Sequence, residues 1–83
     1  MSNRESRLMA RQPNHEIRIG LIKVSILRKR SNQAQSYSFK LERLFRDGEH
    51  WRKSTRLDQG DLLVASKALE LAFEWVDLES ENQ

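Results

Sequence analysis

The chain has 83 residues, no cysteine, 33% charged residues and a formal net charge of +3. A chain this short forms one domain with a thin core, and without cysteine it has neither disulfides nor thiolate metal sites, which leaves a partner subunit as the expected source of extra stability. Its start lacks the apolar run of a secretory signal, and no stretch approaches the roughly 20 apolar residues that span a bilayer, so we expect a cytoplasmic protein without membrane contact.

The charge is divided unevenly along the chain. Residues 1–57 contain fourteen Lys/Arg and five Asp/Glu, whereas residues 58–83 contain one lysine and seven acids. Because the basic part has the pattern of β-strands and the acidic part that of a helix, the two charges fall on different surfaces. A basic sheet favours a polyanionic partner such as nucleic acid, and the same split could equally serve self-association.

The first thirty residues contain a predicted arm and the first strand region. Residues 1–14 are polar and basic without periodicity, so we expect a disordered arm that either has no role or adds non-specific phosphate contacts. Residues 16–30 alternate like a strand, but the apolar side changes near Gly20, which predicts either one long bent strand or two short strands. One side would carry Ile17, Ile19 and Leu21, and the other Ile22, Val24 and Ile26.

Two further strands are predicted over residues 37–45 and 50–57, joined by a turn at Asp47-Gly48. A two-residue loop at this dipeptide would pair Arg43 with Arg52. A three-residue loop that begins at Arg46 avoids this like-charge pair and gathers the apolar residues on one face, so we expect the longer loop. That face would carry Tyr37, Phe39, Leu41, Phe45, Trp51 and Leu57.

A helix is predicted from about Gln59 to Val76, with Asp58 as its N-cap and residues 78–83 as an acidic tail. Its apolar residues form two neighbouring stripes that together cover more than one side. The first stripe is Leu62, Ala65, Leu69, Ala72, Phe73 and Val76, and the second is Leu63, Ala68, Leu71 and Trp75. Since one small sheet cannot cover both, we expect a homodimer with the second stripe at its interface.

The sheet face opposite the helix is the expected binding surface. Phosphate contacts are predicted for Lys23, Lys29, Lys40, Arg52 and Arg56, and stacking of bases for the rings of His50 and Tyr37. The other rings are expected in the core, and an ordinary solvated face is the alternative interpretation. With two histidines, no cysteine and three isolated glycines, the sequence predicts neither catalysis nor a metal or cofactor site.

Three segments carry a resemblance to known proteins. Residues 17–23, residues 43–51 and residues 61–63 with Lys67, Ala72 and Trp75 resemble a family of short uncharacterised bacterial proteins over about residues 16–76. The order of strands then helix is similar to the repeat of purine-rich-element-binding (Pur) proteins and to whirly-like single-stranded-DNA-binding transcriptional coactivators. Those families pair two units, cross their helices and bind single strands on curved sheets. The resemblance therefore implies a dimer, a single-stranded ligand and a fourth strand made by division near Gly20.

Taken together, the sequence predicts one α+β domain over residues 15–77, an antiparallel three- to four-stranded sheet followed by one C-terminal helix that mediates dimerisation. We expect a non-enzymatic protein that binds single-stranded DNA or RNA on the outer sheet face. The alternative is a homo-oligomeric interaction module without nucleic acid. In it the acidic helix edge of Glu70, Glu74 and Asp77 would meet the basic sheet face of another protomer.

Overall fold

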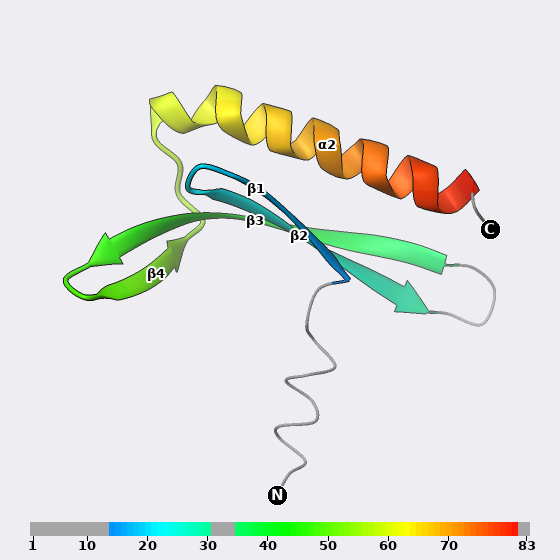
Figure 1. The fold of residues 1–83 in the computed structure, drawn as a ribbon, viewed down its shortest axis with the longest axis horizontal. Helices are drawn as coiled ribbons and strands as arrows, with labels where there is room; N and C mark the ends of the chain where they lie inside the picture. The colour runs from blue at the N-terminus through cyan, green and yellow to red at the C-terminus, as the bar shows by residue number, and fades with distance from the viewer. Residues whose placement is uncertain (1–13, 31–34, 82–83) are drawn as a thin grey trace, which may run out of the picture.

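A four-stranded antiparallel sheet carries a single long helix on one face (Figure 1). The computed structural model describes residues 14–30 and 35–81. The elements are β1 (His15–Ile19), β2 (Ile22–Arg30), β3 (Gln35–Asp47), β4 (His50–Ser54), the 3-10 turn η1 (Gln59–Asp61) and α2 (Leu62–Glu81). This confirms the α+β class and the order of sheet then helix. The predicted arm lies outside the described residues, apart from Asn14.

The first strand region forms two strands, β1 and β2, joined at Gly20-Leu21. Ile19 pairs with Ile22, and Gly20 has a φ of 59°, which a residue with a side chain adopts only at a cost. A single positive φ at the first loop position is the pattern of a type II′ hairpin turn. The N–H of Leu44 in β3 donates to the carbonyl of Leu21 at 2.7 Å, so the turn is also tied to its neighbour. The change of apolar side is therefore a chain reversal, and the sheet has four strands.

The β3-β4 hairpin has a register that the sequence analysis did not predict. Its loop is Gly48-Glu49, with Asp47 paired to His50 and Gly48 at a φ of 67°. Arg43 therefore faces Ser54, and both expected registers are wrong. The error came from centring the turn on Asp47-Gly48, whereas glycine takes the first loop position, as it does in the Gly20 turn. In this register the Nε of Arg52 donates to Oδ2 of Asp47 at 2.7 Å across the hairpin.

The new register exchanges the two faces of β4 and shortens the strand. Phe45 pairs with Arg52 and Arg46 pairs with Trp51, so Trp51 leaves the face that it was expected to share with Phe45. The strand ends at Ser54 instead of Leu57. Because β2 pairs with β3 only as far as Arg43, the β3-β4 hairpin extends beyond the end of the β1-β2 hairpin (Figure 1).

The 3-10 turn η1 starts at Gln59, where the sequence predicts the helix, whereas α2 itself begins at Leu62 and ends later than predicted. The N–H of Asp58 donates to Oδ2 of Asp61 at 2.8 Å, and the guanidinium of Arg43 in β3 forms ion pairs with both carboxylates, at 3.5 Å to Asp58 and 2.9 Å to Asp61. The helix then runs to Glu81 rather than Val76, so residues 78–81 of the expected tail are helical. One contact in this last part is the 3.5 Å pair between Arg28 in β2 and Glu79.

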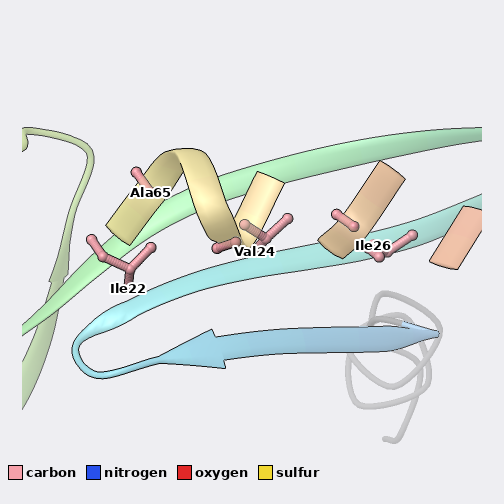
Figure 2. Packing of buried hydrophobic residues seen from close by; sticks show 6 residues of the cluster. Ile22, Val24, Ile26 and Ala65 are labelled. Carbon is pink, nitrogen blue, oxygen red and sulfur yellow. The ribbon is translucent and has the colours of Figure 1, made fainter. Parts of the chain in front are cut away.

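The core lies between β2 and α2 and is made of small and branched side chains (Figure 2). It consists of Ile22, Val24 and Ile26 from β2 with Ala65, Ala68 and Ala72 from α2, none of which is more than 4% exposed. Three alanines on the buried side let the helix lie close to the sheet. The larger apolar residues of α2 consequently lie at the edges of this contact rather than within it.

Candidate nucleic-acid interface

The sheet face turned away from α2, called the outer face below, is basic. Strand residues alternate between the two faces, and the core residues of β2 mark the face that α2 covers. The registers then assign every other strand residue to the opposite face. Among the described residues its basic side chains are Arg18, Lys23, Lys29, Lys40, Arg46 and Lys53, and its acidic side chains are Glu16 and Glu42. Positive charge is therefore in excess on this face.

A hollow of about 280 Å³ lies at the centre of the outer face. It is lined by Glu16, Lys23, Ser25, Leu27, Lys40, Glu42 and Lys53, so all four strands contribute. Ser25 and Glu42 are buried, at 8% and 6% exposure, and form its deeper part. Three lysines and two carboxylates thus line the hollow together with one hydroxyl and the apolar side chain of Leu27.

The lysines of this face differ in exposure and in whether a carboxylate lies near their ammonium group. Lys23 is 14% exposed and lies 3.9 Å from Glu16, whereas Lys40 is 63% exposed and lies 3.7 Å from Glu42. Within residues 14–30 and 35–81, neither Lys29 nor Lys53 has an ion-pair partner. Each pair has one largely buried member, Lys23 in the first and Glu42 in the second. The ammonium groups of Lys29 and Lys53 are therefore available to a polyanion, and that of Lys40 is exposed but lies beside Glu42.

Trp51 gives the outer face an exposed ring. Its side chain is 57% exposed, and the guanidinium carbon of Arg46 lies 5.3 Å from its ring centroid. Both residues lie on the part of the β3-β4 hairpin that extends beyond β2. Lys53 follows on the same side of β4 and lines the hollow. The outer face therefore continues from a cluster of lysines to a ring held beside an arginine.

Only part of the predicted site comes together. Lys23, Lys29 and Lys40 share the outer face, as expected. Arg52 and His50 lie on the opposite face, because the hairpin register differs from the predicted one. Arg56 lies in the segment between β4 and η1, where its N–H donates to Oγ of Ser54 at 3.0 Å.

Tyr37 was expected to be an exposed ring, but it packs beneath the helix. Its ring meets Trp75 edge-on at 6.1 Å, and the guanidinium of Arg28 lies 5.8 Å from it. It is half-buried on the face that α2 covers. Tyr37 therefore belongs to the packing of the helix and not to the outer face.

The predicted interface stripe of α2 is divided in the same way. Ala68 is fully buried in the core, and Trp75 stacks on His15 with ring centroids 4.6 Å apart. Leu71 is half-buried, and Leu63 is 83% exposed. Two members of the stripe are thus used within the protomer. Ala68 therefore has no surface left for a dimer interface, whereas Trp75 is half-buried and its place in an interface stays a prediction.

Three residues of the outer face were not predicted there: Trp51 was expected on the opposite face, Arg46 in the turn, and Lys53 had no assignment. One signal could have placed them. Both hairpins place glycine first in a two-residue loop, and this choice at Gly48 fixes the faces of β4.

Comparison of the chain with protein-family models, with curated proteins and with solved structures found no match. No helix in the described part of the chain is long and apolar enough to cross a membrane. The function is therefore inferred from the residues of the outer face themselves.

Proposed function

We propose that this chain is a small non-enzymatic protein that binds single-stranded DNA or RNA on its outer face. The observation that carries the proposal is the exposed ring of Trp51, beside Arg46 and in line with the lysines around the hollow. Proteins that bind single strands combine a basic groove for the backbone with rings on which bases stack. Both parts occur here on one face.

The roles of the residues follow from their chemistry. Lys29, Lys40 and Lys53 would neutralise phosphates. Among the described residues neither Lys29 nor Lys53 has a carboxylate partner, and Lys40 lies 3.7 Å from Glu42 with its own side chain 63% exposed. Trp51 would stack on a base. Its preference is for an unpaired strand, because the faces of bases within a duplex are already stacked on one another. None of these contacts reads a base edge, so binding should tolerate different sequences.

Titration of labelled oligonucleotides tests this proposal. The fluorescence anisotropy of labelled oligothymidine and oligouridine, each of about 16 nucleotides, should rise when the protein is added at low ionic strength. The log of the affinity should fall with the log of the salt concentration by about 0.7 for each phosphate contact. Lys53→Ala should reduce this slope, whereas the matched change Lys67→Ala on the exposed side of α2 should not. An absence of binding at low salt would contradict the proposal.

A second candidate is an interaction module without a nucleic-acid ligand. It is favoured by the exposure of large apolar side chains on the helix side, where Phe73 is 70% and Phe39 is 50% exposed. In this case the oligonucleotides would fail to bind at low salt although the chain still associates with another protein. The acidic edge expected to take part, Glu70, Glu74 and Asp77, is exposed.

A further inference from the structure

Half of β3 has an open edge. β4 pairs only with residues 43–47 of β3, and β2 pairs with residues 35–43 from the other side. Among the described strands, none pairs with residues 36–42 on the side away from β2. Such a row of unpaired backbone groups is a template for another strand.

The hydrogen-bonding direction of this edge follows from the pairing. The N–H of Leu44 points to Leu21, in the turn just before β2, and in an antiparallel strand alternate residues point to opposite neighbours. Even-numbered residues of β3 therefore point toward β2. The N–H and C=O groups of Tyr37, Phe39 and Leu41 consequently point to the open side.

An apolar flank of the helix lies next to this edge. A hollow of about 390 Å³ is lined by Phe39, Leu69, Ala72, Phe73 and Val76. Phe39 is 50% exposed, Leu69 is 43% exposed and Phe73 is 70% exposed. The opposite flank of α2 faces β1, whose short edge carries the charged Glu16 and Arg18 in the manner of a protected edge. The unprotected edge and the apolar flank are thus on the same side of the molecule.

We propose that a second copy of this chain covers this side, with β3 pairing antiparallel to β3 of the second copy over residues 36–42. A two-fold axis at Phe39 places Phe39 opposite its counterpart and Tyr37 opposite Leu41. On the outer face Lys40 then faces Ser38 and Glu42 faces Ser36. No like charges oppose each other directly, whereas a two-residue shift that pairs Lys40 with its counterpart would be unfavourable.

A second copy fits this side better than an isolated strand. A strand from another protein would pair with the edge of β3 but would leave Phe73 and Leu69 uncovered. A second copy brings a β3 edge and an apolar helix flank together, as an isologous contact requires. Taking about 200 Å² for a whole phenylalanine, the exposed parts of Phe39 and Phe73 supply about 240 Å² in each copy. In two copies these rings supply about 480 Å² of the roughly 1,200 Å² of surface that a specific interface usually buries at least. The leucines and the paired backbones must supply the remainder.

The dimer forms without nucleic acid, but it changes the extent of the outer face. Pairing of the two β3 edges would join both sheets into one, and the two outer faces would become one continuous basic surface. The interface also differs from the one expected from the sequence. It uses Leu69 and Phe73, whereas Ala68 is buried in the core and Trp75 packs on His15 within each protomer.

Light scattering coupled to size exclusion tests the dimer. The chain should have twice the 9.8 kDa of one copy, and Phe73→Glu should return it to 9.8 kDa with an unchanged circular-dichroism spectrum, since this ring is 70% exposed. The matched control is Leu78→Glu, a 60% exposed position on the flank toward β1, which should remain dimeric. A wild-type mass of 9.8 kDa, or a dimer that survives Phe73→Glu, would overturn the proposal.

A second pair of variants tests the strand pairing itself. Phe39→Ala and Phe39→Pro remove the same ring, but only proline removes the N–H that points to the open edge. By symmetry the proline variant loses two hydrogen bonds between the copies, so it should associate about tenfold more weakly than the alanine variant. Equal association of the two would contradict pairing through β3. Both variants should keep the wild-type circular-dichroism spectrum.

Discussion

Arg46 and Trp51 face each other across the β3-β4 hairpin, with the guanidinium carbon 5.3 Å from the ring centroid. A ring covered on one side by a cation, and 57% exposed, has its remaining surface available to a flat partner. The pair exists because the loop is Gly48-Glu49. A loop one residue longer or shifted would have placed Trp51 elsewhere, so the turn and the binding surface are linked.

Trp51→Ala should weaken binding of single strands by about 1–3 kcal/mol, the contribution usual for one stacked base. Trp51→Phe keeps a stacking face and should retain most of the affinity. Neither change should lower the free energy of unfolding by more than about 1 kcal/mol, because the ring is largely exposed. Oligonucleotide anisotropy and urea unfolding measure the two quantities. Equal affinity of the alanine variant and the wild type would exclude Trp51 as the stacking residue.

The hairpin turn should be sensitive to substitution of its glycine. Gly48 has a φ of 67° with no atom within 4 Å of an added Cβ, so Gly48→Ala creates backbone strain without a clash and should destabilise the fold by about 1 kcal/mol. Gly60 is equally open but has no positive φ, so Gly60→Ala should be neutral or slightly stabilising. Thermal unfolding of both variants gives the comparison. A similar loss of stability in the two variants would count against a positive φ at position 48.

Ala68→Leu should reduce the free energy of unfolding by about 1–3 kcal/mol, because the residue is fully buried against β2 and leaves no room for a larger side chain. Leu63→Ala, at a position that is 83% exposed, should change it by less than about 0.5 kcal/mol. Urea unfolding at several protein concentrations separates core packing from subunit contact. A tolerated leucine at position 68 would mean that α2 packs on the sheet differently.

The ion pairs of Arg43 with Asp58 and Asp61 should couple the sheet to the start of the helix. Arg43→Ala and Asp61→Ala should each lower the free energy of unfolding by about 1 kcal/mol, the second because the N–H of Asp58 also loses its acceptor. The double variant should lose less than the sum of the two, by about 0.5 kcal/mol or more. If the double variant loses the full sum of the two single losses, the ion pair between Arg43 and Asp61 contributes nothing to stability.

The elements could be predicted from the sequence because their patterns are local. The alternation of residues 16–30, the glycine at their centre and the acidic start of the helix each depend on neighbouring residues. For residues 16–30 the sequence left two alternatives, one bent strand or two short strands. The structure has two strands, with a turn at Gly20-Leu21.

The faces of β4 could not be predicted with the same success, because they depend on one choice of register. Grouping all large apolar residues on one face favoured a loop that buried Trp51 beside Phe45. That criterion failed because the core of this small protein is built on β2 and the alanines of α2, and the β3-β4 hairpin extends past it. Arg52 and His50 were misplaced for the same reason, whereas the lysines of β2 and Lys40 were placed correctly.

The most direct test of the proposed function uses the two tryptophans, which lie on opposite faces of the sheet. Trp51 is exposed on the outer face, and Trp75 packs on His15 and Tyr37 beneath the helix. Their indole N–H groups give two NMR signals that can be assigned with Trp51→Phe. Addition of oligothymidine at low salt should shift the Trp51 signal and leave the Trp75 signal in place. If neither signal moves, or if only the Trp75 signal does, the outer face is not a nucleic-acid interface.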